Sequence, residues 1–365
     1  MEKDELSIKS FAEIYTIELI SLTSLVLPAV LVGLADKRGM FVLVASSVVF
    51  LLQGMMTWLF VKKQGKSPDE ILQKRKGFWT KICQELYILR YFLHGLFLTV
   101  VFVDLIKTVL LPECTETEIL IPFLLLVAYT GSKKFSVRRR MMRVLFPCIF
   151  LPLFCVLLLS LFQLDYSFLP QQLWGEGRSL WGKDLIYGIY GVLVLYQPVE
   201  FILFLFPKIK SNKKRDVGKY VFAVCIVVIL LNITIYVAAV GLLGTVRVGR
   251  ELWSALYIMQ SVRLPGHFLE RLDILFIPFW IFSTFTSVSS YYYYGSLFLS
   301  EKKEDVRHGK GKIVIYAAVW TVVGLFLALW INKPQRMFEL FMPYKMWIDF
   351  PLSLLLLFFI YCRKD

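Results

Sequence analysis

A proline and a glutamate lie inside one of the most apolar stretches of the chain, the segment VLYQPVEFILF at residues 194–204. Pro198 removes a backbone hydrogen bond from any helix that it enters. Glu200 carries a charge that is expensive to bury unless protein or water surrounds it. The two residues therefore predict an interrupted helix whose free backbone groups and carboxylate lie inside the protein.

A second apolar stretch is interrupted near the start of the chain, in SLTSLVLP at residues 21–28, by Ser21, Thr23, Ser24 and Pro28. At a helix break, freed carbonyls suit an ammonium group and the positive end of a half-helix suits a carboxylate. A free amino acid carries both groups, so two such breaks predict an amino-acid site. The alternative is that the hydroxyls are ordinary packing residues and the proline of the other segment only kinks its helix.

Four charged side chains near these segments have more than one interpretation. Glu200 either holds a ligand amine, stabilises freed backbone, relays a proton, or is satisfied by helix N–H groups or a lysine. Glu18 either faces the interior, towards Arg90, or lies at the membrane interface. Arg90 and His94, one turn apart, either line an inner vestibule or anchor their helix at the interface, and we favour the interface.

Hydroxyl groups are unusually dense in the segment 270–299 for a helix that faces lipid. They either satisfy carbonyls of their own helix or line a hydrated path or ligand pocket. Tyr291 to Tyr294, which follow them, predict an aromatic belt at the cytoplasmic interface. The hydroxyl residues are Ser283, Thr284, Thr286, Ser287, Ser289 and Ser290.

The elements that must position these residues are membrane-spanning helices. Of the 365 residues, 58% are hydrophobic and 19% are charged, which predicts a single all-α polytopic membrane domain over residues 1–365. In the third span, Asp104 and Lys107 are predicted to pair. Spans need about 20 apolar residues, and the candidates are 10–34, 40–61, 84–111, 119–132, 144–162, 184–206, 220–243, 270–299, 313–331 and 347–362.

The connections between these spans alternate in charge. Those after the second, fourth, sixth and eighth spans are dense in lysine and arginine, which places them and both termini in the cytoplasm. The net charge of +14 is then a topology signal with an attraction to anionic membrane lipid, and nucleic acid is not an expected partner. Residues 69–79 and 137–146 predict either amphipathic surface helices or solvated connectors.

Ten spans with both ends inside divide into two halves of five, and an odd number per half makes the second half inverted. We therefore predict a five-plus-five inverted repeat, residues 1–162 and 184–362, with broken helices 1 and 6. The prediction rests on parity and on the matching breaks, because the halves share no detectable sequence similarity. No enzyme motif, cofactor motif or metal-binding cysteine and histidine cluster is found, so no catalytic residue, cofactor or metal is expected.

Three tracts resemble the spore germination permeases, the B subunits of nutrient germinant receptors. The resemblance extends in order over nearly the whole chain, and that family is similar in turn to the amino acid–polyamine–organocation transporters, whose fold is the five-plus-five inverted repeat. The tracts are GHFLERLDILFIPFWIFS (266–283), LLPECTETEILIPFLLLVAYTGSKKFSVRRRMMRVLFP (110–147) and PVEFILFLFPKIKSNKK (198–214).

The resemblance implies a receptor subunit in the spore inner membrane that works with A and C subunits and senses a small nutrient, such as an amino acid. It implies a site between helices 1, 3, 6 and 8 and a response by conformational change, with ion or water passage as one output. The alternative is a proton- or sodium-coupled amino-acid transporter. Carried over by position, the contacts are Ser21, Thr23, Ser24, Phe97, Val101, Gln197, Pro198, Glu200, Ser283, Thr286 and Ser287.

The chain departs from the wider transporter superfamily at both breaks. Glycines commonly mark the first break there, whereas Ser21 and Ser24 stand at it here. Gln197 and Pro198 are bulkier than the small residues that the second break often carries. Both changes narrow the expected ligand space, so the nutrient is expected to differ or the pocket to be partly degenerate.

Overall fold

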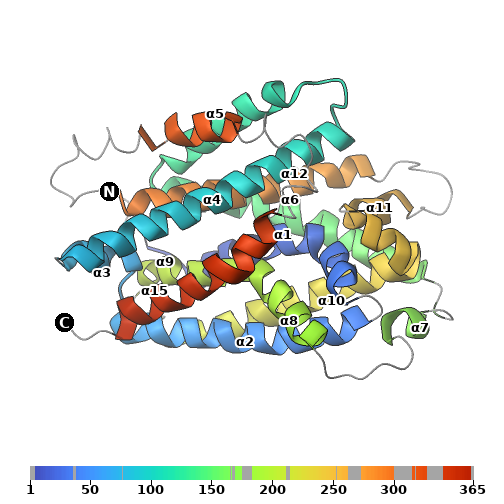
Figure 1. Ribbon diagram of the computed structural model, residues 1–365, viewed down its shortest axis with the longest axis horizontal. Helices are drawn as coiled ribbons and strands as arrows, with labels where there is room; N and C mark the ends of the chain where they lie inside the picture. Colours follow the sequence, from blue (N-terminus) through green and yellow to red (C-terminus); the bar gives the residue numbers. More distant parts are fainter. Residues whose placement is uncertain are drawn as a thin grey trace.

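The protein is a bundle of long helices in the computed structural model, and both ends of the chain lie at the same end of the bundle (Figure 1). All named elements among the described residues are helices, and an isolated parallel β-bridge joins Leu6 to Ile209. The structure describes residues 5–35, 38–75, 77–164, 166, 169–174, 183–210, 214–251, 253–261, 273–299, 315–316, 318–326 and 340–362.

The described helices overlap most of the predicted spans, but several begin earlier or end later than predicted. The first five spans correspond to α1 (Ile8–Ala35), α2 (Gly39–Gln64), α4 (Phe78–Val109), α5 (Glu116–Gly131) and α6 (Phe135–Phe162). The seventh, eighth and tenth correspond to α10 (Val217–Arg250), α12 (Asp273–Leu297) and to η5 (Lys345–Asp349) with α15 (Phe350–Cys362). Short connecting helices are α3 (Pro68–Lys74), α7 (Leu169–Trp174) and α11 (Ser254–Ser261).

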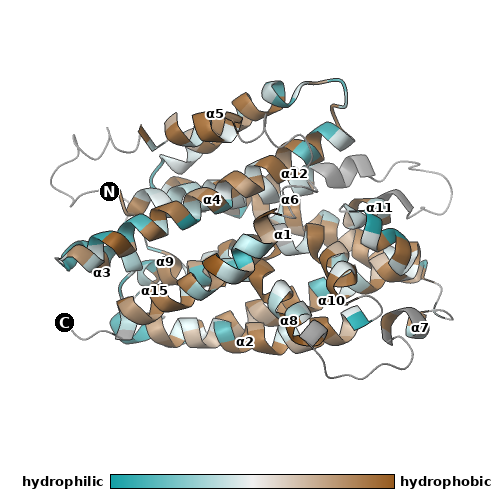
Figure 2. Cartoon of the chain, viewed as in Figure 1, coloured by the Kyte–Doolittle hydropathy of each residue, from teal (hydrophilic) through white to brown (hydrophobic). Residues whose placement is uncertain are grey.

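Six helices of the described chain are long and apolar enough to cross a membrane, and a bent pair makes a seventh. Apolar residues cover most of their length, and hydrophilic residues gather towards helix ends, for example at α3 (Figure 2). The protein is therefore an integral membrane protein. The count of ten spans and the inverted repeat stay predictions, because parts of the ninth span, including 327–331, and the start of the eighth lie outside the described residues.

The sixth predicted span, which is called helix 6 and is a different element from α6, is broken where the sequence predicts. It consists of α8 (Lys183–Leu195), the 3₁₀ turn η2 (Gln197–Phe201), α9 (Ile202–Leu205) and the 3₁₀ turn η3 (Phe206–Lys208). The two parts are bent by 44° at the break. Pro198 stands at the start of η2, where its missing N–H ends the α-helical ladder.

Helix 1 is continuous, so the prediction of a break at residues 21–28 is wrong. The hydroxyls of Ser21, Thr23 and Ser24 donate to carbonyls three or four residues earlier in α1 itself. Such bonds satisfy the polar groups without opening the helix. Pro28 is accommodated inside the helix.

The middle of the bundle is formed by α1, which packs mainly against α10, α8, α12 and α6. Glycines allow the closest approaches between other helices. A Cβ added at Gly95 of α4 would collide with the ring of Trp320, and one at Gly131 of α5 would collide with Tyr292 of α12. The first of these contacts places Trp320 of the ninth predicted span against α4.

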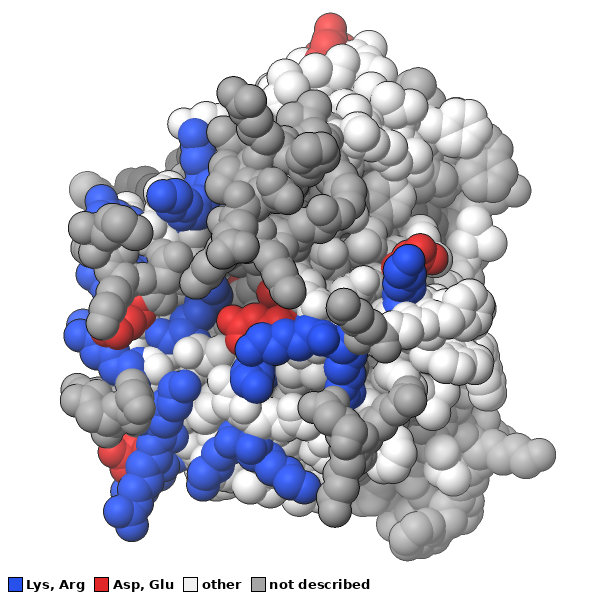
Figure 3. Space-filling model, turned by 90° about the vertical axis from the view of Figure 1, so that its left-hand side faces the viewer, with Lys and Arg blue, Asp and Glu red and all other residues white. Residues whose placement is uncertain are grey.

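The end of the bundle that holds both termini and α3 carries many lysine and arginine side chains (Figure 3). The N-terminus is fixed there, because Leu6 N–H donates to the Lys208 carbonyl at 2.7 Å and Lys210 N–H donates to the Leu6 carbonyl at 3.3 Å. The predicted surface helix at 69–79 is α3, and 137–146 lies in the first part of α6. The exposed basic residues at this end include Lys62, Lys63, Lys74, Lys134, Arg140 and Lys210.

Candidate functional site

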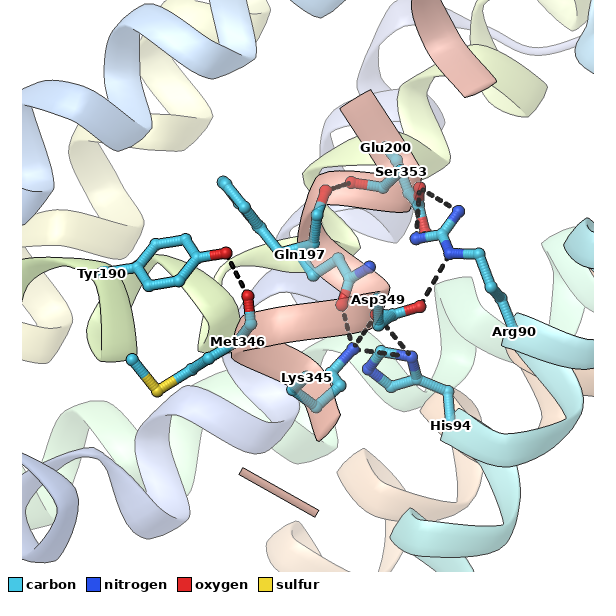
Figure 4. A network of polar contacts seen from close by, with 10 residues as sticks. Arg90, His94, Tyr190, Gln197, Glu200, Lys345, Met346, Asp349 and Ser353 are labelled. Atoms are coloured by element: carbon cyan, nitrogen blue, oxygen red, sulfur yellow. Dashed lines mark hydrogen bonds and ion pairs between the residues drawn. The ribbon is translucent and has the colours of Figure 1, made fainter. Parts of the chain in front are cut away.

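A buried ionic cluster fills the space beside the break of helix 6 (Figure 4). Arg90 of α4 is 1% exposed and Asp349 of η5 is fully buried. The Arg90 Nε donates to Asp349 Oδ1 at 2.7 Å. The same guanidinium contacts the Glu200 carboxylate of η2 at 3.3 to 3.4 Å. One arginine therefore joins α4, the break of helix 6 and span 10.

The Lys345 ammonium, which is 1% exposed, has a complete set of acceptors from three elements. It donates to Asp349 Oδ2 at 2.7 Å, contacts His94 Nδ1 at 2.7 Å and donates to the Gln197 side-chain oxygen. Because an ammonium has three donors and no acceptor, His94 Nδ1 must accept, which assigns the ring proton to Nε2. The His94 ring also stacks on Tyr291 with centroids 4.6 Å apart.

Arg90 and His94 thus face the interior, and the interfacial placement that we favoured for them is wrong. The structure also contradicts the alternative in which a lysine satisfies Glu200, because the partner of Glu200 is Arg90. Buried charges in a membrane span are stable when each has a partner of opposite sign. The cluster satisfies this condition within the described chain, with Lys345 and Arg90 balancing Asp349 and Glu200.

A line of hydroxyl groups joins α1 to α12. The Ser290 hydroxyl donates to the Glu18 carboxylate at 2.8 Å, and the Tyr294 hydroxyl donates to the same oxygen at 3.1 Å. One turn later in α1 and one turn earlier in α12, the Ser287 hydroxyl donates to the Ser21 hydroxyl. Glu18 therefore faces the interior, as one of the two alternatives predicted. Its partners are residues of α12, however, and not Arg90.

Arg138 closes this line from a third helix. Its guanidinium, at the buried face of α6, donates to the Ser289 carbonyl at 2.8 Å and to the Ser289 and Ser290 hydroxyls at 2.7 and 2.6 Å. Ser290 thus contacts both a cation and the Glu18 carboxylate. The hydroxyls of α12 serve as an interface between helices, and some of them also bond their own helix, as Thr286 does to the Ser283 carbonyl.

Some buried polar atoms of these two regions have no hydrogen-bond partner among the described residues. They are the Ser283 and Thr284 hydroxyls of α12, the Gln197 amide nitrogen at the break, and one oxygen of Glu18. Buried polar groups are almost always paired, so each of these atoms calls for a partner that the described chain does not supply. Water or a polar ligand would fill that role.

The remaining predicted contacts are buried but make apolar or local interactions. Phe97 stacks on Phe341, with ring centroids 3.6 Å apart. Val101 and Pro198 are buried. The hydroxyls of Thr23 and Ser24 bond their own helix. The structure thus connects Ser21 with Ser287, brings Gln197 and Glu200 into the ionic cluster, and leaves Ser283 with an unpaired hydroxyl.

Two further predictions are corrected. Tyr291 to Tyr294 are buried in the bundle and do not form an interfacial belt, because their rings pack against one another and against rings of other helices. Lys107 pairs with Glu116 at 3.0 Å instead of Asp104, and Asp104 accepts from the Trp253 indole at 2.9 Å. The four tyrosine side chains are buried because α12, which carries them, lies between α4, α5, α6 and α1.

Sequence reasoning missed Lys345, Asp349 and Arg138. The first two residues are four apart at the edge of an apolar run, a spacing that places opposite charges on one helix face. Arg138 was hidden in a basic connection, but its spacing to the apolar residues Met142 and Ile149 is helical, and all three lie on the buried face of α6.

The fold and its buried polar centre at a broken helix define a polytopic membrane protein with a transporter fold. A Na⁺-coupled sialic acid symporter in a substrate-bound, outward-open state has a TM-score of 0.64 at 12% identity, over 96% of this chain and 78% of that chain. MhsT in complex with L-phenylalanine has a TM-score of 0.66 at 11% identity, over 90% and 81%. A manganese transporter from Eremococcus coleocola has 0.61 at 13% identity, over 95% and 78%.

The chain belongs to the spore germination protein family, whose model matches residues 5–334. A curated relative, spore germination protein A2 of Bacillus subtilis (strain 168), is 26% identical over 349 residues, which cover 93% of this chain and 91% of the relative. The match to the family model ends before Lys345 and Asp349. These two residues therefore lie outside the matched part of the chain.

Proposed function

We propose that the protein is the B subunit of a spore nutrient germinant receptor and that it binds a small nutrient, such as an amino acid, at mid-membrane. Its family membership supports the role in germination. Its transporter fold supports a binding site inside the bundle, since broken helices in such folds surround the substrate. Binding would favour one arrangement of the helices and so start germination by a population shift.

The observation that carries this proposal is the unpaired polar surface inside the bundle. The Ser283 hydroxyl and the Gln197 amide nitrogen are buried, lie on two of the helices expected to contact the nutrient, and have no partner in the described chain. Each of these groups is a hydrogen-bond donor with which a ligand carboxylate can pair. The Ser21 hydroxyl, which contacts Ser287 between α1 and α12, would limit the site on the side of α1.

The charges of the ionic cluster limit which groups of the protein can hold the nutrient. Glu200 is engaged by Arg90 and the Lys345 ammonium already has three acceptors. A nutrient therefore meets balanced charges, and its own groups are recognised through hydroxyl, amide and backbone groups. Glu200 is then close to the nutrient as part of the break, and its loose contact with Arg90 leaves it free to exchange partners.

The cellular setting belongs to the same proposal. The lysine and arginine residues at the end with both termini support a cytoplasmic location of that end, and the family supports the spore inner membrane. The A and C subunits of the receptor are the proposed protein partners. Anionic lipid would neutralise the basic connections.

Ser283→Ala tests the proposal. Because the hydroxyl has no partner in the described chain, its removal should leave the thermal stability of the purified protein unchanged or slightly higher. The nutrient concentration for half-maximal germination should rise by about threefold or more, since a ligand hydrogen bond of about 1 kcal/mol is lost. Ser46→Ala is the matched control, because Ser46 is buried in α2 and bonds its own helix.

An unchanged dose response of Ser283→Ala spores, at equal receptor amounts, would contradict the proposed site. The panel of nutrients should contain the proteinogenic L-amino acids, each supplied singly. The absence of any response of wild-type spores that depends on this protein would contradict the proposed receptor function itself.

A secondary amino-acid transporter is the second candidate, and its support is the similarity of fold to coupled transporters. Uptake of labelled amino acids into proteoliposomes separates the two functions. Binding without net transport supports the receptor, whereas saturable accumulation driven by a proton or sodium gradient supports the transporter.

A further inference from the structure

Span 10 contacts both parts of the broken helix 6. On the side of α8, the Tyr190 hydroxyl donates to the Met346 carbonyl of η5. On the side of η2, the Gln197 side-chain oxygen accepts from the Lys345 ammonium. Figure 4 shows both contacts on neighbouring residues of one helical turn. A single turn of span 10 therefore bridges the bend between α8 and η2.

The sequence of span 10 makes the contact with α8 available. The turn Lys345–Asp349 is a π-helix, in which Phe350 N–H donates to the Lys345 carbonyl five residues earlier. The next bond of this pattern would join residue 351 to the Met346 carbonyl, but Pro351 has no N–H. The Met346 carbonyl is thus released from the helix, and the Tyr190 hydroxyl satisfies it.

The contact with η2 is fixed by a chain of alternating charges. Lys345 contacts Asp349, Asp349 contacts Arg90, and Arg90 contacts Glu200. Two cations and two carboxylates sum to zero, and each inner member has a partner on both sides. Because Asp349 uses one oxygen for Lys345 and the other for Arg90, span 10 holds Glu200 indirectly as well as Gln197 directly.

We propose that this turn of span 10 is a splint across the break of helix 6, in which Lys345, Asp349 and the Tyr190–Met346 contact are positioning elements that set the sensitivity of the receptor to its nutrient. The effect of the splint on sensing rests on the proposed function, whereas its effect on the break does not. It holds Gln197 and Glu200 in the arrangement that binds nutrient. A loosened splint lowers the population of that arrangement, which raises the apparent dissociation constant.

Two variants loosen the splint in different ways. Tyr190→Phe removes the hydroxyl that reaches span 10 and keeps the ring, and Tyr187→Phe is its control because Tyr187 is an exposed residue of the same helix. The double variant Lys345→Met with Asp349→Asn removes the second contact while it leaves Arg90 opposite Glu200. The net charge of the cluster stays at zero, whereas either single substitution leaves one unit of unbalanced charge.

Hydrogen–deuterium exchange of the purified protein without nutrient measures the break directly. Both variants should increase the exchange rate of residues 196–208 by about three- to tenfold, because local opening of the break requires one interaction fewer. Residues 217–243 of α10 serve as the internal reference and should not change. An unchanged rate at 196–208, or an equal increase in both regions, overturns the splint.

Germination of spores that carry each variant measures its role in sensing. With the proteinogenic L-amino acids supplied singly, the half-maximal concentration should rise by about threefold in both variants and stay at the wild-type value in Tyr187→Phe. Faster local exchange with an unchanged dose response overturns the positioning role. If wild-type spores show no response, the proposed function fails, and the exchange measurement still decides whether the splint exists.

Discussion

Arg90 holds Asp349 more tightly than it holds Glu200. Its Nε lies 2.7 Å from Asp349 Oδ1, whereas the shortest distance from its guanidinium to the Glu200 carboxylate is 3.3 Å. Charge-assisted hydrogen bonds are normally about 2.7 to 2.9 Å long. Asp349 is therefore the main counter-ion of Arg90, and Glu200 is the member of the cluster that is most able to change partners.

This difference predicts unequal losses of stability for two substitutions that each neutralise a carboxylate. Asp349→Asn leaves two buried cations with one carboxylate and should lower the stability of the protein by about 3 to 5 kcal/mol. Glu200→Gln leaves the same imbalance of buried charge but removes only contacts of 3.3 to 3.4 Å, so it should cost less stability than Asp349→Asn, and it should change the response to nutrient. Thermal unfolding of both purified variants is the measurement. A larger loss in Glu200→Gln, or a wild-type nutrient response of its spores, would show that the assignment is reversed.

The hydroxyl contact between α1 and α12 predicts energetic coupling of two serines. Ser21 donates to its own helix at the Glu18 carbonyl and accepts from Ser287. In a double-mutant cycle, Ser21→Ala and Ser287→Ala should couple by about 0.5 to 1.5 kcal/mol. Ser21→Ala combined with Ser46→Ala, whose hydroxyl bonds the Leu43 carbonyl of α2, should be additive. Additive losses in the first pair would mean that the two helices do not depend on this contact.

The balance of buried charge predicts that the receptor prefers nutrients without net charge. A charged ligand would add an uncompensated charge, which costs several kcal/mol in a buried site. Glutamine should therefore be at least about tenfold more effective than glutamate, its near-isostere, in any response that either elicits. A stronger response to glutamate, or to lysine, would contradict this reasoning. The buried arginine, lysine, aspartate and glutamate residues of the described spans are three basic and three acidic ones, namely Arg90, Arg138, Lys345, Glu18, Glu200 and Asp349.

The connecting helix α3 predicts a pH-dependent stability change. Burial raises the pKa of the Asp69 carboxyl above its usual range, against smaller effects of Ser67 and Lys208 that lower it. The folded state therefore binds the proton more tightly than the unfolded state, so this residue destabilises the protein as pH rises above its unfolded pKa of about 4. Asp69→Asn should raise the melting temperature at neutral pH and lose this advantage in acid.

Glu70→Gln is the control for that measurement, since Glu70 is the exposed neighbour of Asp69 in the same helix. It removes only the smaller like-charge effect of Glu70 on Asp69, so at neutral pH it should change the melting temperature less than Asp69→Asn does. A stabilisation by Asp69→Asn that persists equally in acid would mean that its cause is not the ionisation of the carboxyl.

The sequence predicts the break of helix 6 but not the continuity of helix 1, and the two cases differ in their chemistry. In helix 6, Pro198 removes a donor and Glu200 requires a partner, and neither requirement can be met within the helix. In helix 1, the hydroxyls of Ser21, Thr23 and Ser24 are satisfied by carbonyls of the same helix. Hydroxyl-rich stretches therefore predict a polar helix face without predicting an interruption.

The ionic cluster was only partly predictable because its members are far apart in the sequence. Glu200 stands out in an apolar run, and Arg90 and His94 lie one turn apart, but nothing near them in the sequence indicates their partners on span 10. Asp349 lies 259 residues from Arg90. No local pattern reports a contact at that distance, and only packing of span 10 against α8 and η2 creates it.

A structure of the assembled receptor with an effective nutrient bound is the most direct test of the account. We expect the nutrient between α1, α12 and the break of helix 6, with a polar atom within hydrogen-bond distance of the Ser283 hydroxyl or the Gln197 amide nitrogen. A nutrient bound elsewhere in the receptor, with both of these atoms paired to other protein groups, would contradict it.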